Sequence, residues 1–298
     1  MPFARPISES REPVPPVEGV VTAPRSHKDL IRTEFTKQAA TYPANASIAD
    51  PNRVMRLVQD VDPSADAKVL EVATGPGYVA LGFATVCKEV VGVDLTPALL
   101  EKAEQLRQER GLSNLSLQLE DAEELPFAEG EFDVVVCRLA FHHFPEPARV
   151  LREMTRVCRL GGSVAVEDLI ASEHEARAAY QNEFERLRDP SHTRALPLSE
   201  LLELFEAAHL EVETVKTDAL VPAVEEWLAN AKTPSDMGPT VRAMIERDAA
   251  EDLSGTQPFW REGALYFTQR TAAVVGRRLG PPGRVICQVR SVLAGRRR

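Results

Sequence analysis

Short apolar runs alternate with helical stretches from Lys68 to Val166, and no other feature constrains the fold of this chain as strongly. The apolar runs fall at residues 68–72, 90–93, 115–119, 133–137 and 163–166. Strands that are buried on both faces read as continuous apolar runs of this kind. Strands that alternate with helices build a parallel sheet with helices on both of its faces. We therefore predict an α/β fold.

Two helices are predicted within this alternation. The first connects the second and third apolar runs, with Thr96 placed to cap it and Gly111 placed to end it. The second covers about 147–157, and the glycine pair 161–162 closes it. Both helices lie between consecutive runs, where parallel strands need a crossover connection.

The segments on either side of the alternation are predicted to be helical for the most part. A helix begins near Ser26, and a second one begins at Pro51 after a cap at Asp50. After the fifth strand we expect helices over 172–188 and 199–209, a strand near 211–217, a helix-rich stretch over 224–253 and a last strand within 264–275. We assign Trp260 and Phe267 to the core.

Composition excludes several classes of protein. The chain has 298 residues, of which 44% are apolar, so it is able to bury an ordinary core. It contains no apolar run of the roughly 20 residues that span a membrane, and its N-terminus has no signal-peptide pattern. Four cysteines lack the spacing of a disulfide framework or a metal site: Cys87, Cys137, Cys158 and Cys287. We expect a cytoplasmic protein without a metal ion or an integral membrane segment.

Charge is distributed unevenly along the chain. The net charge is -10, yet the residues from Arg277 onward include seven arginines and no acid. The preceding residues hold 28 basic against 45 acidic side chains, and an acidic body disfavours nucleic acid as a partner. For the basic end, a solvated tail is favoured over a contact with an anionic partner.

A strand runs into a glycine-containing turn and then a helix at residues 69–78, with the sequence Val-Leu-Glu-Val-Ala-Thr-Gly-Pro-Gly-Tyr. Glycine lets backbone N–H groups approach a ligand that a Cβ atom would hold away. The spacing Gly75-x-Gly77-x-x-Ala80 also satisfies the dinucleotide fingerprint. This motif alone leaves the class of cofactor open.

Asp94 ends the second predicted strand, 19 residues after Gly75. A carboxylate at this strand end accepts hydrogen bonds from both ribose hydroxyls of an adenosine. The alternative is a solvated acid at the end of the strand, or a helix cap. Because dinucleotides and S-adenosylmethionine (SAM) both contain that ribose, Asp94 does not distinguish between them.

Three other features favour SAM. Glu71 precedes the glycine turn, where a carboxylate suits a cationic amino-acid group and repels a pyrophosphate. Asp121 follows the third strand, where it is able to read an adenine amino group. Helical sequence precedes the first strand, whereas dinucleotide enzymes often begin with that strand.

Several motifs, in this order, make the chain similar to the class I SAM-dependent methyltransferases. The resemblance is to the small-molecule group that includes the ubiquinone and menaquinone C-methyltransferases, and it covers about residues 30–220. The motifs are 69–77 (VLEVATGPG), 91–94 (VGVD), 120–127 (EDAEELPF), 132–137 (FDVVVC) with the histidine pair 142–143, and 159–162 (RLGG).

The resemblance implies a Rossmann-like, doubly wound, mostly parallel seven-stranded sheet with strand order 3-2-1-4-5-7-6. In that fold the last strand is antiparallel, a helical lid precedes the sheet, and a helical insertion precedes the last strand. We thus expect a methyltransferase domain over 26–280, with helical cap elements at about 172–195 and 222–256. A disordered proline-rich arm is expected over 1–25 and a disordered basic tail over 281–298.

The resemblance also implies a set of residues that bind SAM. Those expected at its methionine part are Glu71, Ala73, Gly75 and Gly77. Those expected at its adenosine are Asp94, which holds the ribose, Leu95, Asp121 and Ala122. Arg138 and Leu139 are expected to line the methyl-donor pocket. The family commonly has glycine where this chain has Ala73. Tyr42, in a pattern F-x-x-x-A-x-x-Y that starts at Phe35, either contacts the carboxylate of SAM or packs in the lid.

His142 and His143 follow the fourth strand, at the edge of the sheet where ligands bind. Imidazole titrates near neutral pH, so either histidine is a candidate catalytic base for an acceptor that must lose a proton. The alternative is a hydrogen-bonded structural histidine that caps the turn before Pro145. Arg188, Asp189 and His192 are further candidates to face the acceptor.

The implied function is methyl transfer from SAM to carbon or oxygen of a small acceptor, such as a quinol or phenol, by a monomer or homodimer. Two alternatives stay open: an NAD-dependent oxidoreductase, although Tyr-x-x-x-Lys is absent, and a non-catalytic SAM-binding scaffold. The apolar residues within 224–253 either cap the donor methyl group or complete the core: Trp227, Leu228, Met237, Val241, Met244 and Ile245.

Overall fold

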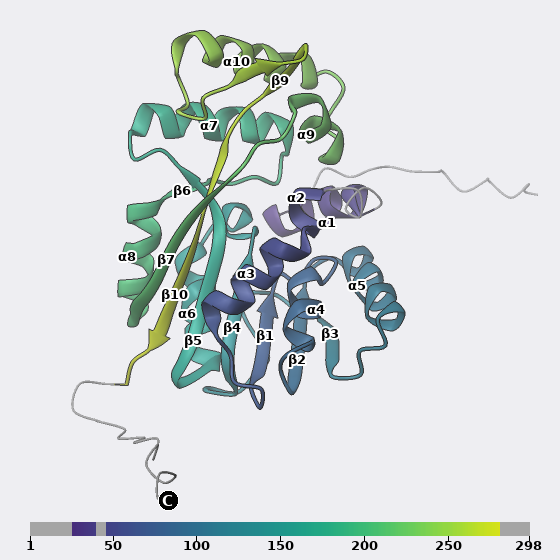
Figure 1. Cartoon of the computed structure of the whole chain (residues 1–298), viewed down its shortest axis with the longest axis vertical. Helices are drawn as coiled ribbons and strands as arrows, with labels where there is room; N and C mark the ends of the chain where they lie inside the picture. The colour runs from purple at the N-terminus through teal and green to yellow at the C-terminus, as the bar shows by residue number, and fades with distance from the viewer. Residues whose placement is uncertain (1–25, 40–45, 281–298) are drawn as a thin grey trace, which may run out of the picture.

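The computed structural model describes residues 26–39 and 46–280 (Figure 1). Its helices are α1 His27–Gln38, α2 Ala46–Ala49, α3 Pro51–Val61, α4 Tyr78–Ala84, α5 Pro97–Glu109, α6 Pro147–Val157, α7 Glu175–Arg188, α8 Leu198–Ala207, α9 Val224–Asn230 and α10 Gly238–Glu251. Its strands are β1 Lys68–Val72, β2 Glu89–Asp94, β3 Leu115–Leu119, β4 Phe132–Arg138, β5 Cys158–Ala171, β6 Leu196–Pro197, β7 Leu210–Leu220, β8 Phe259–Arg261, β9 Ala264–Tyr266 and β10 Gln269–Arg278. The expected arm 1–25, the expected tail 281–298 and Tyr42 lie outside the described residues.

The main sheet has the strand order β3-β2-β1-β4-β5-β10-β7. Pairs from β3 to β5 are parallel, and β10 is antiparallel to both of its neighbours, β5 and β7. Since β7 is the sixth and β10 the seventh long strand of this sheet along the chain, the predicted order 3-2-1-4-5-7-6 with an antiparallel last strand is confirmed. The parallel strands all end at one edge of the sheet.

Two apolar clusters hold helices against the two faces of the sheet. On one face, α3 and α4 pack through Val58 and Phe83 onto Val69. On the other face, α6 and α8 pack through Met154 and Phe205 onto the same strands. Each of these side chains is buried, and full burial of an apolar side chain stabilises the fold by about 1.5–3 kcal/mol. The sheet is thus covered on both faces, as its apolar strands predict.

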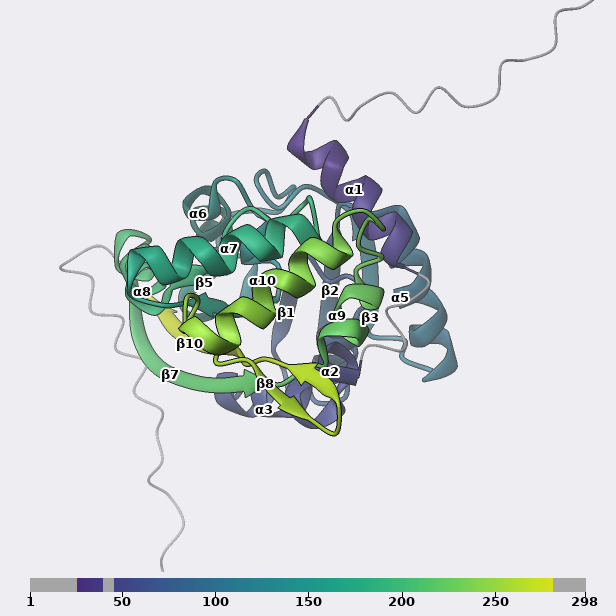
Figure 2. The ribbon, with the colours of Figure 1, turned by 90° about the horizontal axis from the view of Figure 1, so that it is seen from above.

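Long strands lead from the sheet into a separate helical cap (Figure 1). Seen from above, α7, α9 and α10 lie over the end of the sheet, with α1 at its side (Figure 2). The cap has its own apolar cluster, which includes Phe184, Trp227, Val241, Ile245 and Phe267. Trp227 and Ile245 therefore stabilise the cap. Of the two alternatives, a surface over the donor methyl group and a part of the core, their burial in this cluster favours the core.

Several details of the sequence prediction are wrong. The last strand is interrupted at Phe267, so that 264–266 belongs to a hairpin with β8 that the prediction missed. Trp260 lies in this hairpin with 53% of its surface exposed, whereas Phe267 is fully buried. The turn of the hairpin is Glu262-Gly263, and both residues have positive φ, as a tight two-residue hairpin turn requires.

The glycine pair 161–162 also has a different role from the predicted one. It lies within β5, which follows α6 without a break, rather than at the end of the helix. A Cβ atom on Gly162 would lie 2.6 Å from the carbonyl oxygen of Asp133 on the neighbouring strand. Glycine is therefore needed here for the close approach of two strands.

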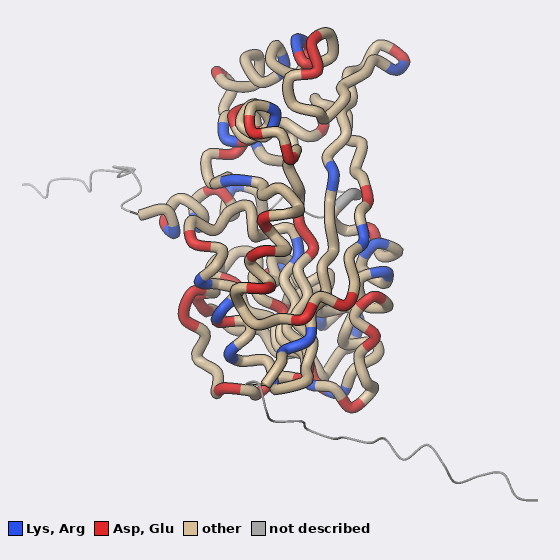
Figure 3. Tube along the Cα trace, turned by 90° about the vertical axis from the view of Figure 1, so that its left-hand side faces the viewer, with Lys and Arg blue, Asp and Glu red and all other residues tan. Residues whose placement is uncertain are grey.

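Charged side chains of both signs are interspersed along the described chain (Figure 3). Among the described helices, none combines the length and the apolar character that a membrane span needs. The ion pairs that link distant elements are mostly exposed, and such pairs contribute little stability.

Candidate functional site

A cavity opens at the carboxyl ends of β1, β2, β3 and β4, under α1. It encloses about 990 Å³ of empty space, part of it open to solvent. Its lining includes most of the residues predicted to bind a cofactor, together with one histidine: Glu71, Ala73, Gly75, Asp94, Leu95, Asp121, Ala122, Arg138, Leu139 and His143. Gly77 and His142 do not line it.

The glycine turn has left-handed backbone at Ala73, Gly75 and Gly77, with φ of 54°, 55° and 82°. A Cβ atom on Gly75 would meet no other atom within 4 Å, because this residue faces open space. A Cβ atom on Gly77 would lie 3.0 Å from the Cβ of Ala103 in α5. Gly75 thus exposes backbone to the cavity, Gly77 permits helix packing, and Ala73 holds a conformation that favours glycine.

Asp94 braces the turn from the end of β2. Its Oδ2 accepts a hydrogen bond from the N–H of Gly75 at 2.8 Å, and its Oδ1 accepts one from the N–H of Thr96 at 2.8 Å. Burial raises the pKa of Asp94, and these hydrogen bonds oppose the rise. Because each carboxylate oxygen accepts about two hydrogen bonds, both oxygens keep one acceptor position. Asp94 therefore supports the start of α5 and still faces the cavity with acceptor capacity.

Groups of opposite charge lie at the β1 and β4 side of the cavity. The Oε2 of Glu71 accepts hydrogen bonds from the hydroxyl of Thr74 at 2.5 Å and the N–H of Ala80 at 2.7 Å. Burial raises the pKa of Glu71 to about 8, although these hydrogen bonds and the charge of Arg138 oppose the rise. A carboxyl group of raised pKa and a guanidinium thus border one end of the cavity.

Arg138 has donors that the described residues leave unused. Its Nη1 donates to the carbonyl oxygen of Ile48 at 2.9 Å. Its Nε lies 3.3 Å from Oε1 of Glu167, an ion pair whose geometry falls short of a hydrogen bond. Within 26–39 and 46–280, neither Nε nor Nη2 makes a hydrogen bond, and both atoms are buried. Buried donors without partners destabilise a protein by about 1–3 kcal/mol each, so this arrangement suits a ligand that accepts hydrogen bonds.

Helix α1 covers the cavity from the side of β3. Lys28 pairs with Asp121 at 2.6 Å and with Glu123 at 2.7 Å. The ring of Phe35 contacts the ring of His143 edge to face, with centroids 4.8 Å apart. This arrangement agrees with the predicted lid, and it places an ammonium group beside Asp121, the residue predicted to read adenine.

The two adjacent histidines have different partners. Nδ1 of His142 lies 2.5 Å from Oδ1 of Asp168. Burial opposes protonation of His142, but the carboxylate of Asp168 outweighs it and the pKa is raised. Nδ1 of His143 lies 3.1 Å from Oγ and from the carbonyl oxygen of Ser191. Burial and the neighbouring His142 lower the pKa of His143 to about 4.

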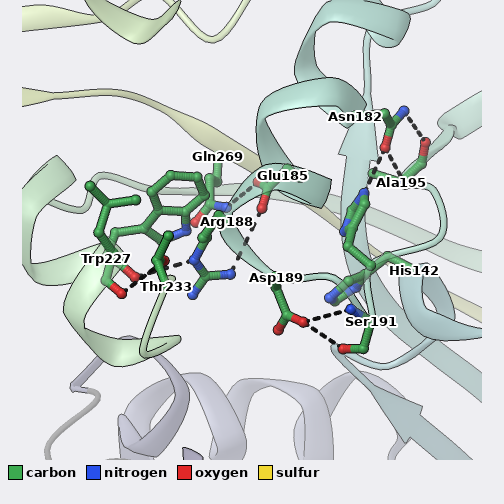
Figure 4. Close-up of polar contacts among 12 residues, drawn as sticks. His142, Asn182, Glu185, Arg188, Asp189, Ser191, Ala195, Trp227, Thr233 and Gln269 are labelled. Carbon is green, nitrogen blue, oxygen red and sulfur yellow. Dashed lines mark hydrogen bonds and ion pairs between the residues drawn. The ribbon is translucent and has the colours of Figure 1, made fainter. Parts of the chain in front are cut away.

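A buried polar network continues from the histidines into the cap (Figure 4). The hydroxyl of Ser191 donates to Asp189 at 2.6 Å, and the Nε2 of Gln38 in α1 donates to the other oxygen of Asp189 at 2.8 Å. Glu185 accepts a hydrogen bond from the amide of Gln269 at 2.7 Å. Asp189 was a predicted candidate, whereas the roles of Ser191, Glu185 and Gln269 were missed.

Asp168 was also missed, although the sequence holds a signal for it. Glu167 and Asp168 come directly after the fifth apolar run, as Asp94 comes directly after the second. An acid at the carboxyl end of a parallel strand faces the edge where ligands bind. Its pairing with His142 depends on β4 and β5 being neighbours, which the sheet order provides.

Comparison with known proteins agrees with this fold. The family model described as a methyltransferase domain matches residues 70–166. The chain is 33% identical over 204 residues to the uncharacterized methyltransferase YcgJ of Bacillus subtilis, an alignment of 68% of this chain and 81% of YcgJ. The crystal structure of YcgJ superposes with a TM-score of 0.72 and 28% identity over 76% of this chain and 98% of that chain. A putative methyltransferase from Bacillus halodurans, BH2331, superposes with a TM-score of 0.72 and 30% identity over 76% of this chain and 99% of its own.

Proposed function

We propose, from the premise that this chain belongs to the class I SAM-dependent methyltransferases, that it methylates an oxygen or carbon atom of a small quinol or phenol. Methyl transfer itself follows from membership of the family, whose members generally use SAM. The position of the cofactor and the class of acceptor are the proposal. The observation that carries it is the cavity in which Asp94, Glu71 and Arg138 surround the open face of Gly75.

The adenosine part of SAM fits the β2 and β3 side of the cavity. The two remaining acceptor positions of Asp94 suit two neighbouring ribose hydroxyls, each of which donates one hydrogen bond. Leu95 and Ala122 offer apolar surface to the adenine ring, and Asp121 offers an acceptor to its amino group. A hydrogen bond to a charged group contributes about 1.5–3 kcal/mol, so we expect Asp94 to contribute more to the binding free energy than any other residue on this side.

The amino-acid part of SAM fits the β1 and β4 side. It carries an ammonium and a carboxylate group. The carboxylate matches the guanidinium of Arg138. Glu71, whose pKa of about 8 keeps it mostly protonated near pH 7 without a ligand, would be stabilised in its ionised form by the bound ammonium group. The unpaired Nη2 of Arg138 would donate to the carboxylate, which removes the penalty of a buried donor without a partner. A pyrophosphate, by contrast, would disfavour the ionised form of Glu71 and gain nothing from it, so the fit favours SAM over a dinucleotide.

Bound SAM supplies a methyl group on a positively charged sulfur, which is a good leaving group. The chain therefore has to align the acceptor with this methyl group and exclude water. Leu139 and His143 line the cavity next to Arg138 and lie on the side of the cap. We place the acceptor there, with His143, the predicted histidine that lines the cavity, as its candidate partner.

Calorimetry with SAM and S-adenosylhomocysteine, and with NAD as a control, tests the proposed site. Micromolar binding of the first two compounds by the wild type, and its loss in Asp94→Ala, is the expected result. Transfer of label from [methyl-³H]SAM to members of a panel of quinols and phenols then tests the acceptor class. Binding of SAM without transfer to any acceptor would favour the alternative of a non-catalytic scaffold.

A further inference from the structure

A second cavity lies where the cap meets the end of the sheet. Helices α7 and α10 lie side by side there (Figure 2), and the cavity is lined by α7, the loop after α10, the end of β5 and the start of β10. It encloses about 400 Å³ of empty space, part of it open to solvent, and it shares no lining residue with the cavity under α1. Apart from Ile170 and Gly255, every residue in its lining has a polar side chain. The cavity therefore suits a small polar ligand, and the proposed function leaves it unused.

Gln181 brings an amide group without a partner to this cavity. The residue lies on α7 and is 3% exposed, yet its amide makes no hydrogen bond to any residue within 26–39 and 46–280. A buried polar group that lacks a hydrogen bond destabilises the protein. Because Gln181 lines the cavity, a ligand there is able to reach this amide. An amide both donates and accepts hydrogen bonds, so it suits a ligand with a hydroxyl group, which does the same.

Arg270, at the start of β10, gives the cavity its positive charge. The lining holds two arginines against one aspartate, a net charge of +1. Arg177 is paired with that aspartate, Asp252, at 2.5 Å, whereas Arg270 forms no ion pair with the part of the chain that the structure describes. A guanidinium group binds a carboxylate through two parallel N–H groups. The uncompensated charge of Arg270 therefore favours a small anion with one negative charge.

The loop after α10 has its shape before any ligand binds. Asp248, which is 1% exposed, accepts hydrogen bonds from the N–H of Ser254 at 2.7 Å, from the hydroxyl of Ser254, and from the hydroxyl of Thr256 at 3.1 Å. Two residues of this loop, Gly255 and Gln257, have left-handed backbone with φ of 75° and 51°. Such a conformation persists only where the surrounding structure fixes it. The wall of the cavity is thus preformed, which reduces the entropy cost of binding.

A ligand in this cavity would connect elements of the cap. One helical turn after Gln181, Glu185 of α7 accepts a hydrogen bond from the amide of Gln269 at 2.7 Å, and Arg270 is the next residue of β10. Contacts to Gln181 and Arg270 would thus add a second link between α7 and β10. A ligand that binds only the folded chain stabilises it by mass action. Occupancy of the cavity should therefore raise the temperature at which the chain unfolds.

We infer that this cavity is a second binding site, separate from that of SAM, and that its ligand is a small hydroxycarboxylate. The carboxylate pairs with Arg270, and the neighbouring hydroxyl group exchanges hydrogen bonds with the amide of Gln181. The single charge of the ligand matches the net charge of the lining. Inorganic phosphate offers similar oxygen atoms, so it is tested beside the carboxylate. The inference goes beyond the proposed function and does not depend on it.

Calorimetry on the full chain with sodium lactate, sodium acetate and inorganic phosphate at equal ionic strength tests this site. We expect lactate to bind with a dissociation constant of about 1 mM or lower. Acetate, which lacks the hydroxyl group, should bind about fivefold more weakly, and phosphate should also bind more weakly than lactate. Lactate should raise the unfolding temperature, and its affinity should be the same in the presence of S-adenosylhomocysteine.

Two substitutions separate the contacts of the two parts of the ligand. Arg270→Ala should weaken lactate and acetate alike, each at least about 10-fold, because the charged pair is lost. Gln181→Leu, which keeps a similar size, should weaken lactate about fivefold and leave acetate within about twofold. Arg247→Ala removes an exposed arginine of α10 that lies outside the cavity, and it should match the wild type. Thermal unfolding of each variant without ligand shows that it is folded.

Absence of lactate binding by the wild type would overturn the site. Lactate binding that stays within about twofold in Arg270→Ala, or that S-adenosylhomocysteine abolishes, would place the ligand elsewhere and would also overturn it. Tighter binding of phosphate than of lactate, or equal losses of lactate and acetate in Gln181→Leu, would overturn the assigned class of ligand.

Discussion

The two halves of the ligand-binding edge are built in different ways. At the ends of β1 and β2, side chains of Glu71 and Asp94 hold backbone N–H groups of the adjoining turns, so the site is made within short segments. At the ends of β4 and β5, side chains hold one another across long sequence separations, as in the bond from Gln38 to Asp189. We call the first half, formed by Glu71, Asp94 and the backbone N–H groups that they bind, the cradle. We call the second half, which includes Gln38, Asp189 and Ser191, the network; it forms only when the cap and the lid are in place.

This difference has a thermodynamic consequence. A carboxylate that accepts hydrogen bonds from the turn next to its own strand keeps its geometry whenever that turn is folded. A buried network between separate elements is stable only when every member is satisfied, and removal of one partner leaves others unpaired. We therefore expect changes in the cradle to affect SAM binding, and changes in the network to affect stability and methyl transfer.

The largest expected effect is on the cradle. Asp94→Ala removes the hydrogen bond that holds the N–H of Gly75 and the two hydrogen bonds that we propose to the ribose. The SAM dissociation constant should therefore rise about 100-fold, equivalent to about 2.7 kcal/mol. Asp94→Asn, which keeps shape and some acceptor capacity, should give a smaller rise. Calorimetry on both variants gives the values, and an unchanged constant in Asp94→Ala would mean that the ribose lies elsewhere.

A substitution in the network should lower the free energy of unfolding. Asp189→Ala leaves the donors of Gln38 and Ser191 without this partner, and we expect the free energy of unfolding to fall by about 2 kcal/mol in a urea titration. Burial would raise the pKa of Asp189, but His143 and Arg188 outweigh it and the pKa is lowered. Its stabilisation is thus complete above its ordinary pKa and is lost as pH falls through the lower folded value.

The difference in the free energy of unfolding between the wild type and Asp189→Ala should therefore become smaller at acidic pH. A difference that grows as the pH falls would contradict a lowered pKa of Asp189 in the folded protein. A large change in SAM affinity without a change in stability would remove the distinction between cradle and network.

A smaller effect is expected at the backbone of the glycine turn. Ala73 has a φ of 54°, where a Cβ atom is unfavourable. Ala73→Gly relieves this strain but adds conformational entropy to the unfolded chain, so the net stabilisation should be about 0.5–1 kcal/mol. Thermal unfolding measures it, and a destabilised variant would show that the alanine methyl group has a packing role.

The smallest effect is expected at the lid. Lys28 is 33% exposed in its pairs with Asp121 and Glu123, and exposed ion pairs contribute about 0.2–1 kcal/mol. Lys28→Ala should raise the SAM dissociation rate less than about fivefold, with a difference that shrinks at high salt. Stopped-flow release of SAM gives the rate, and a salt-independent difference would point to packing of α1 instead.

The sequence predicts the cradle better than the network, because the cradle depends on local pattern. The residues of the cradle lie within 71–122, each at the end of an apolar run, so strand periodicity alone brings them to one edge. Asp168 was missed because its partner, His142, lies in the turn after a different strand, and Glu185 because α7 joins the site only through the cap. Tertiary placement, rather than local pattern, determines both.

The same reason explains the errors in the fold. The pattern of 264–275 fits one strand, and only the contact of β9 with β8 divides it. Trp260 is a residue type that is usually buried, yet a hairpin outside the sheet exposes it, with Arg242 at 5.9 Å from its ring. Hydrophobic character predicted burial correctly at Phe267, where the strand enters the cap cluster.

A crystal structure of the full chain with S-adenosylhomocysteine would locate the cofactor in the cavity. We expect ribose hydroxyls on the two oxygens of Asp94, the amino-acid end between Glu71 and Arg138, and the sulfur facing the side of His143. Ribose bound away from Asp94, or a carboxylate that makes no contact with Arg138, would contradict this placement.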